Sequence, residues 1–308
     1  VLAGTGIGLG YASATPAAVK WFPSEKKGLI TGLVVAGFGL APVYIAPLSR
    51  YLLAHYGIGG SFRILGTAFL IVTAVLAQFI TNPATTTAGA SVRPVPDEGT
   101  WCRMLRSPRF YSLYLQYAFA ATAGLMIIGH LAKIVAVQSG NTLQIGFLFV
   151  ALLAIFNACG RIAAGVISDH IGRMITIASV CIVQAMIMFF FSYFTTTGGF
   201  LVGSAVVGFN YGACLALFPA TTADLWGTRN LGLNYGILFT SWGVGGVVGP
   251  MLAGKIADLT GAYDMAYNVA GVLLACAAVL AMISYINVSV ASLEGEVTIR
   301  IKTRKKAA

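Results

Sequence analysis

The chain has 308 residues, of which 58% are hydrophobic and only 9% are charged. Soluble domains carry about 25% charged residues, so this composition excludes a soluble globular protein and indicates an integral membrane protein. The apolar segments are long and continuous, which favours membrane-spanning helices over an alternating β-barrel pattern. The net charge of +10 does not indicate nucleic-acid binding, because the basic residues gather in loops and in a C-terminal tail.

The apolar windows predict an all-α polytopic membrane helix bundle with about nine transmembrane helices, since each window is long enough to cross a bilayer. In chain order these are residues 1–19, 28–54, 62–81, 108–138, 143–168, 174–197, 199–223, 232–257 and 263–291. Val1 opens directly in a Gly-rich apolar run. We therefore expect the chain to begin inside a transmembrane helix, as an N-terminally truncated part of a longer protein.

The longest break between these windows, residues 83–107, holds several charged residues and prolines and is expected to be a cytoplasmic linker. It would separate residues 1–82, three spans that remain of an N-terminal bundle, from residues 108–291, a C-terminal six-helix bundle. Residues 292–308 form a basic tail. Lys and Arg concentrate in the linker, the tail and alternate loops, which places the C-terminus in the cytoplasm of a multi-pass protein of the cell inner (plasma) membrane.

Arg161 is the most informative residue, because it lies inside an apolar stretch eight residues before Asp169. Eight helical residues rise about 12 Å, so Arg161 lies within the hydrocarbon core if Asp169 marks the membrane surface. A charge at that depth costs at least about 2.5 kcal/mol and usually serves a function. Asn157 lies one turn earlier on the same face and could orient the guanidinium toward a carboxylate. The alternative is a gate, in which Arg161 pairs with the loop acid.

Other polar and aromatic residues could line a central pathway. His130 and Lys133 lie three residues apart, with Gln116 about four turns earlier on nearly the same face. His130 could move a proton near neutral pH, or these residues could simply lie near the outer surface. Aromatic side chains recur on single helical faces, where they could line a cavity or simply pack against neighbouring helices: Tyr235, Phe239 and Trp242, Asn210 with Tyr211, Tyr11 with Thr15, and Phe38 with Pro42.

Glycines recur as small-xxx-small pairs, which let membrane helices approach closely. These pairs are Gly4/Gly8, Gly6/Gly10, Gly28/Gly32, Gly208/Gly212 and Gly245/Gly249. The five cysteines show no paired spacing, so neither a disulfide framework nor a metal site is predicted. A catalytic set of residues is missing as well, and the chain is expected to be neither an enzyme nor the holder of a cofactor.

The loop sequence Gly165-Val-Ile-Ser-Asp169-His-Ile-Gly172-Arg173 resembles the G-x-x-x-D-x-x-G-R cytoplasmic loop of the major facilitator superfamily. Within that family, other segments are similar to the oxalate/formate antiporter branch and its monocarboxylate-transporter relatives. The similar segments are Gly8-Leu-Gly-Tyr11, Lys20-Trp-Phe-Pro23 with Gly28-Leu29, Asn157-Ala-Cys-Gly-Arg161, Leu217-Phe-Pro219 and Asn234-Tyr-Gly236. The resemblance implies helices four to twelve of a twelve-helix fold.

The resemblance implies that Arg161 binds the substrate carboxylate and that aromatic residues line the cavity, at Tyr11, Phe38, Tyr211, Phe239 and Trp242. Two positions depart from the family pattern. Asn157 stands where proton-coupled carriers usually have an aspartate, which favours anion exchange or a proton carried by another residue. Trp242 stands where the oxalate carrier has a lysine, which favours a monocarboxylate. Asp169, Gly172 and Arg173 would form a gating loop.

These observations predict a secondary active transporter of small organic anions, either a monocarboxylate such as lactate, pyruvate or formate, or oxalate. It would work by alternating access and anion exchange. The expected partners are the carboxylate, the lipid bilayer, and either protons or a counter-anion. A proton-coupled monocarboxylate symporter is the first alternative. A membrane sensor that binds a carboxylate without moving it is the second.

Overall fold

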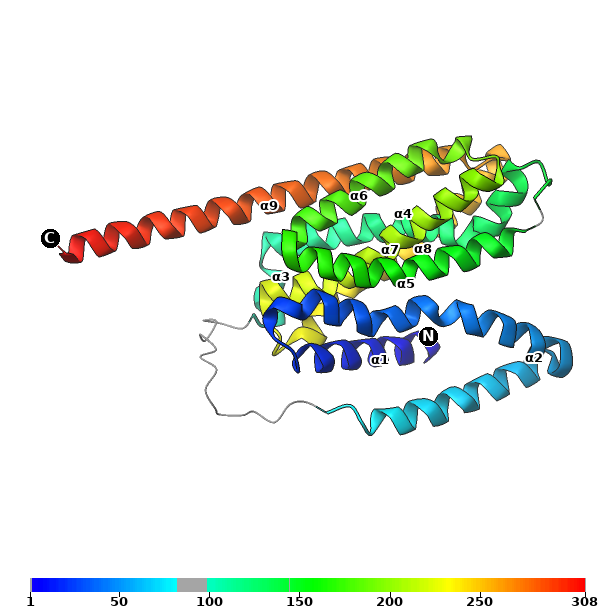
Figure 1. The fold of residues 1–308 in the computed structure, drawn as a ribbon, viewed down its shortest axis with the longest axis horizontal. Coiled ribbons are helices and arrows are strands. Elements are labelled where there is room, and N and C mark those ends of the chain that lie inside the picture. Colours follow the sequence, from blue (N-terminus) through cyan, green and yellow to red (C-terminus); the bar gives the residue numbers. More distant parts are fainter. Residues whose placement is uncertain (1, 82–98, 144, 308) are drawn as a thin grey trace.

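A computed structural model of the chain describes residues 2–81, 99–143 and 145–307, and every regular element in these ranges is a helix (Figure 1). The expected all-α architecture is therefore confirmed. Eight helical segments among the described residues are long and apolar enough to cross a membrane. The first expected span coincides with α1 (Leu2–Val19), whose 18 residues extend about 27 Å, but α1 is not one of these eight segments.

The second and third expected spans are the two limbs of α2 (Lys27–Ala77), which follows the 3₁₀ helix η1 (Ser24–Lys26). The chain reverses direction around Gly57, so the second limb runs back in the opposite direction and diverges from the first (Figure 1). Gly57 has φ 63° and ψ −176°, a conformation that residues with a Cβ atom rarely adopt. The first limb packs against α5, whereas the second exposes most of its apolar side chains.

The expected linker contains a short helix, α3 (Trp101–Leu105), while its residues 82–98 lie outside the described ranges. The described end of the linker is fixed by backbone contacts. The Gly99 N–H donates to the Trp226 carbonyl at 3.2 Å, and the Asn234 amide donates to the Gly99 carbonyl at 2.9 Å. This part of the linker therefore holds the end of α7 close to the start of α8.

The six expected C-terminal spans appear as six long helices. They are α4 (Pro108–Gln138), α5 (Gly146–Ile171), α6 (Arg173–Phe190), followed by the 3₁₀ helix η2 (Phe191–Tyr193), α7 (Thr197–Trp226), α8 (Leu231–Thr260) and α9 (Asp264–Ala307). Their boundaries agree with the expected spans within a few residues, except that α9 continues as helix through the expected tail.

Glycines bring pairs of these helices into backbone contact. A Cβ atom added at Gly208 or Gly212 of α7 would overlap the carbonyl oxygens of Leu153 or Asn157 on α5. The α4–α8 pair is equally close, since a Cβ atom at Gly249 would overlap an α4 carbonyl. These contacts confirm the predicted role of the small-residue pairs in helix packing.

Among the described residues, three glycines of α1 show no such contact. Cβ atoms added at Gly6, Gly8 and Gly10 would have no neighbour within 4 Å. Sequence spacing shows that a helix could approach there, but it does not show that one does.

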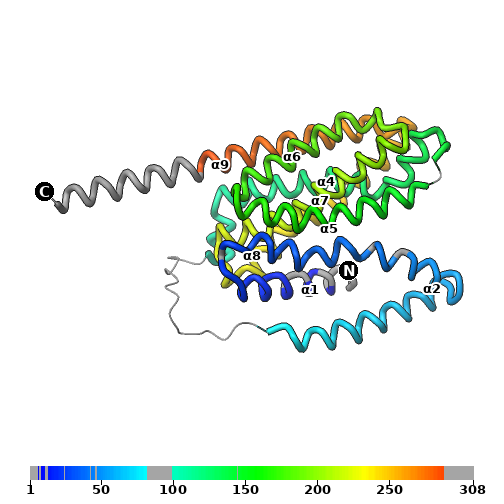
Figure 2. The backbone as a smooth tube through the Cα atoms, viewed as in Figure 1, coloured from blue at the N-terminus to red at the C-terminus, as the bar shows by residue number. Residues whose placement is uncertain are grey.

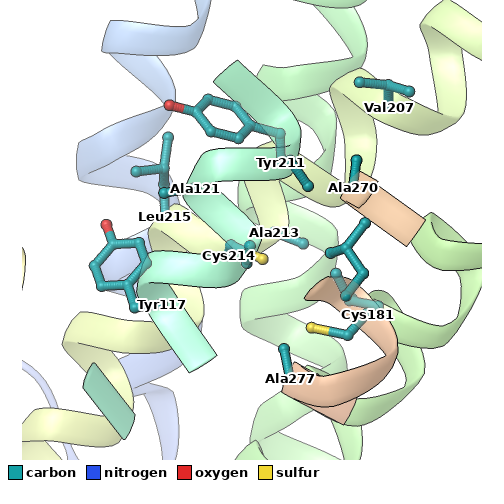
Figure 3. Packing of buried hydrophobic residues seen from close by; sticks show 14 of the residues in the cluster. Tyr117, Ala121, Cys181, Val207, Tyr211, Ala213, Cys214, Leu215, Ala270 and Ala277 are labelled. Carbon is teal, nitrogen blue, oxygen red and sulfur yellow. The ribbon is translucent and has the colours of Figure 1, made fainter. Parts of the chain in front are cut away.

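The described core draws on all six helices from α4 to α9, and Figure 3 shows the part where small side chains such as Ala121, Ala213 and Ala277 lie among α4, α6, α7 and α9. The helix α1 and the first limb of α2 run along one side of the α4–α9 group, where the α2 limb packs against α5 and α1 contacts α2 and α8 (Figure 2). The boundary between α2 and α5 is where Arg161 lies.

Candidate functional site

The Arg161 side chain is buried in the middle of α5, with 4% of its surface exposed. Its Nε–H donates to Asn157 Oδ1 at 2.8 Å, so the two residues that share a helical face by spacing also contact each other. A second hydrogen bond runs from Arg161 Nη1 to the Val35 carbonyl of α2. Both acceptors are neutral, so these two bonds orient the guanidinium without cancelling its charge.

The backbone of α2 is close to this turn of α5 because glycines face it. A Cβ atom at Gly32 would overlap the Arg161 carbonyl, and one at Gly39 would lie 3.0 Å from the Ala158 Cα. Larger residues would hold the helices apart and move the Val35 carbonyl away from the guanidinium. The close contact between α2 and α5 therefore depends on the absence of side chains at Gly32 and Gly39. Arg161 forms a polar link across this seam.

The Asp169 carboxylate closes one end of the same seam. Its two oxygens accept hydrogen bonds from the backbone N–H groups of Gly28 and Leu29, each at 3.0 Å. These are the first turns of α2, where N–H groups lack intrahelical partners and the helix dipole favours a negative charge. Arg173 Nη1 adds an ion pair with Asp169 at 2.7 Å, with the two side chains only 11% and 7% exposed.

Asp224, at the end of α7, joins this group of charges. It pairs with Arg173 Nε at 2.8 Å and with Lys27 Nζ at 3.2 Å, so α2, α6 and α7 meet there. We call Lys27, Asp169, Arg173 and Asp224 the charged end of the bundle. Gly172 lets α6 begin immediately after α5, because its φ of 94° turns the chain between the two helices.

Neither Asp224 nor Lys27 was singled out from the sequence. The available signal was weak. An acid at the end of one span and a lysine at the start of another indicate a pair only once the helix packing is known.

Three of the aromatic residues proposed as cavity lining lie together on α7 and α8. Trp242 Nε1 donates to the Tyr211 hydroxyl at 2.7 Å, and the Trp242 and Phe239 rings stack with centroids 5.0 Å apart. Gly124 of α4 makes room for Tyr211, because a Cβ atom there would overlap the Tyr211 ring. The result is a small aromatic group in which the Trp242–Tyr211 hydrogen bond fixes the orientation of two rings.

Tyr117 of α4 extends this group, and the sequence analysis did not single it out. Its ring stacks on Phe218 with centroids 4.1 Å apart and 10° between planes, and its hydroxyl lies 3.3 Å from that of Tyr235. Tyr117 and Tyr235 are both 1% exposed. At these two positions the aromatic faces pack against other helices, which is the alternative that the sequence analysis kept open.

The remaining predicted site residues lie elsewhere. The side chain of Tyr11 is outside the described part of the structure, and Phe38 on α2 is 46% exposed. His130 Nε2 lies 3.0 Å from the Pro250 carbonyl, which can only accept, so the Nε2 atom carries the hydrogen of that bond. The His130 ring also packs against Tyr263, between α8 and α9. Burial and the nearby Asp258 raise the pKa of Tyr263, so its hydroxyl stays protonated at neutral pH.

Gln116 does not face a central pathway, contrary to expectation. Its side chain is fully buried and donates to Ser112 at 3.1 Å and to Ser284 of α9 at 3.4 Å. At the level of Gln116, the predicted polar stripe on α4 is therefore directed toward α9. The prediction missed this because helical spacing does not reveal which neighbouring helix a face meets.

Residues 1–250 match the family model described as Major Facilitator Superfamily. The chain belongs to this family. The expected fold is thereby confirmed, and membership of a transporter family, with transporters among its relatives, indicates a transporter instead of an enzyme. The multi-pass membrane character inferred from the apolar helices agrees with the family.

Two curated relatives illustrate the position of this Major Facilitator Superfamily chain. It is 29% identical over 262 residues to the oxalate:formate antiporter of Oxalobacter formigenes, an alignment that covers 83% of this chain and 61% of the antiporter. It is 26% identical over 287 residues to monocarboxylate transporter 13 of Bos taurus, covering 89% of this chain and 63% of that protein. The resemblance to this branch of the family is thus confirmed, and the chain spans less than two thirds of the length of these relatives.

The transporter FucP, solved in its outward conformation, is similar in fold. The superposition has a TM-score of 0.63 at 14% sequence identity and covers 88% of this chain and 72% of FucP. At this identity the similarity concerns the Major Facilitator Superfamily fold alone.

Proposed function

We propose that the protein carries small organic anions of the monocarboxylate class across the membrane by exchange, with Arg161 as the residue that binds the carboxylate. The single observation that carries this proposal is a buried guanidinium in the middle of a membrane-spanning helix, oriented by hydrogen bonds to the Asn157 side chain and the Val35 carbonyl. An arginine remains charged at any relevant pH, and its planar fork matches a carboxylate. The named activities of the relatives, oxalate:formate antiport and monocarboxylate transport, support the same substrate class.

Asn157 favours exchange over proton-coupled symport. It accepts the hydrogen bond from Arg161 Nε at 2.8 Å, and an amide cannot take up or release a proton in the physiological range. An aspartate at this place would bind a proton when its ion pair with the arginine breaks and release it when the pair forms. The Arg161–Asn157 pair therefore provides a fixed positive charge, and a second anion is the simplest partner that compensates it in the return step.

The charged end of the bundle would act as one gate of the alternating-access cycle. It fastens the start of α2 to α5, α6 and α7 through Asp169, Arg173 and Asp224. These contacts join the two proposed bundles, so they must break when that end opens. By the distribution of Lys and Arg, we propose that this end and the C-terminus face the cytoplasm of a cell inner (plasma) membrane.

The test uses the complete protein in proteoliposomes loaded with formate, lactate, pyruvate or oxalate, and measures counterflow of a labelled anion with and without an imposed pH gradient. We expect exchange that does not require the gradient. Replacing Arg161 by alanine should lower the rate at least about thirtyfold, because losing a buried charge contact costs about 2 kcal/mol or more. Arg161→Lys should recover only part of the rate, since lysine lacks the fork.

Arg109→Ala is the matched control, because Arg109 is an exposed arginine at the start of α4. Each variant is first shown to be monodisperse with an unchanged melting temperature. Full transport by a folded Arg161→Ala variant would exclude Arg161 as the anion site. Counterflow that appears only with a pH gradient would favour the proton-coupled alternative.

A further inference from the structure

The core between α6 and α7 contains polar atoms without protein partners. Gln184 of α6 is 3% exposed, and neither its Nε2 nor its Oε1 atom has a hydrogen-bond partner among the described residues. Asn210 of α7 is 4% exposed, and its Nδ2 atom also has no partner within the described ranges. For Gln184 this result does not depend on which way the amide is turned, because both of its ends are unpartnered.

Both amides line the same small cavity. It has a volume of about 10 Å³ and is bounded by α4, α6, α7 and α9. Its remaining lining comes from small or apolar residues and from Tyr211, the residues being Ala120, Gly124, Val180, Tyr211, Cys214 and Leu274. A cavity of roughly 10 to 15 Å³ accepts one water molecule. The space therefore has the size of one water and lies beside the two unpartnered amides.

We propose that this cavity is a binding site for a single internal water molecule that bridges Gln184 and Asn210. A water molecule can accept hydrogen bonds from the two amide NH₂ groups and donate one to Gln184 Oε1, which satisfies all three atoms. Burying such groups in an apolar core without partners is strongly unfavourable, and internal waters typically make about three hydrogen bonds. A water here would join α6 to α7 through the two amides.

The chemistry of the lining excludes larger or charged ligands. None of the eight lining residues carries a charge at neutral pH, so an ion would lack compensation in the membrane interior. A carboxylate substrate carries a full charge and is larger than one water molecule, so it would not fit this cavity. The site is thus separate from Arg161, although Tyr211 borders both this cavity and the aromatic group.

The first test is an experimental density map of the complete protein at a resolution that shows ordered waters. We expect a peak within about 2.7 to 3.2 Å of amide atoms of both Gln184 and Asn210. A dry cavity would overturn the proposal, and so would a map in which the two amides have turned to bond each other directly.

The second test is a double-mutant cycle on thermal stability. Gln184→Leu and Asn210→Leu should each lower the melting temperature, because each strips the water of partners and leaves the other amide unsatisfied. The double variant should lose clearly less than the sum of the two losses, since it removes the whole polar site. Additive losses would contradict a shared water.

Ser204 provides the matched control for the cycle. It is also a fully buried polar residue of α7 with an unpartnered side-chain atom among the described residues, but it does not line this cavity. Ser204→Ala combined with Gln184→Leu should therefore be additive. Equal coupling in both cycles would indicate a general effect of apolar substitution and would overturn the assignment of the water to Gln184 and Asn210.

Discussion

The charged end offers the sharpest test of how the two sets of helices are held together. Asp169 accepts two hydrogen bonds from the start of α2 at 3.0 Å each and one ion-pair contact from Arg173 at 2.7 Å. Asp169→Asn keeps the size of the side chain but removes the charge and one acceptor oxygen. We expect the conformer in which this end is closed to lose population.

The magnitude follows from the contacts that are lost. Hydrogen bonds to a charged group contribute about 1.5 to 3 kcal/mol, and the Asp169–Arg173 pair is 7% and 11% exposed, so solvent screens it little. Because asparagine retains one acceptor, we expect a loss of about 2 kcal/mol. This corresponds to about a thirtyfold shift in the ratio of closed to open conformers.

The assay is a pulsed electron-spin distance measurement on the complete protein in nanodiscs. Spin labels at Lys26→Cys and Arg229→Cys report the separation of α2 from the α7–α8 loop, because both positions are exposed at the charged end. The exposed native cysteines are first replaced by serine: Cys102, Cys159 and Cys276.

We expect Asp169→Asn to move the distribution from shorter to longer distances. Asp258→Asn is the control, since Asp258 is an exposed acid in the last turn of α8, away from the charged end. If Asp169→Asn gives the same distribution as Asp258→Asn and the unsubstituted protein, the Asp169 contacts do not hold this end closed.

Three further variants test packing and hydrogen bonding. Gly212→Ala should destabilise the protein by about 1 to 3 kcal/mol, because the new methyl group overlaps the α5 backbone and forces α5 and α7 apart. Gln138→Leu should cost about 1 to 3 kcal/mol, because Gln138 donates to two carbonyl groups around η2 at 2.6 and 3.0 Å and accepts from a tyrosine hydroxyl of α9 at 2.9 Å. Gly124→Ala should displace Tyr211, break its hydrogen bond with Trp242, and raise the KM for the anion more than it lowers kcat. Thermal unfolding measures the first two effects, and exchange kinetics measure the third.

Each variant has a control on the same type of residue. Gly243→Ala should not lower the melting temperature, because a Cβ atom there meets nothing within 4 Å. Gln78→Leu is the control for Gln138→Leu, because Gln78 is an exposed glutamine directly after α2. Gly129→Ala serves for Gly124, since its Cβ atom would make ordinary contacts of 3.6 Å with Pro250. The reasoning fails wherever a variant and its control behave alike.

The helices and the Arg161–Asn157 contact were predictable from local spacing. Long apolar windows define the spans, and residues one turn apart on a helix share a face. The reversal within the N-terminal part was predictable as well, because the break between the second and third windows contains Gly57.

Contacts between distant segments were not predictable in the same way. Asp169 was expected to belong to a gating loop, but its partners Gly28 and Leu29 lie about 140 residues earlier in the chain. Gln116 was expected to face a pathway and instead meets Ser284. Periodicity fixes which residues share a face, whereas the neighbour of that face depends on how all the helices pack.

The hydrogen bond from Arg161 to the Val35 carbonyl has a consequence for the proposed exchange cycle. An incoming anion that takes this donor for itself also removes a polar link between α5 and α2. Occupancy and loosening of the seam would then occur together, so a loaded carrier could reorient while an empty one would stay locked. Obligatory one-for-one swapping of anions, with no slippage by the unloaded protein, is the behaviour that such an acceptor exchange would produce.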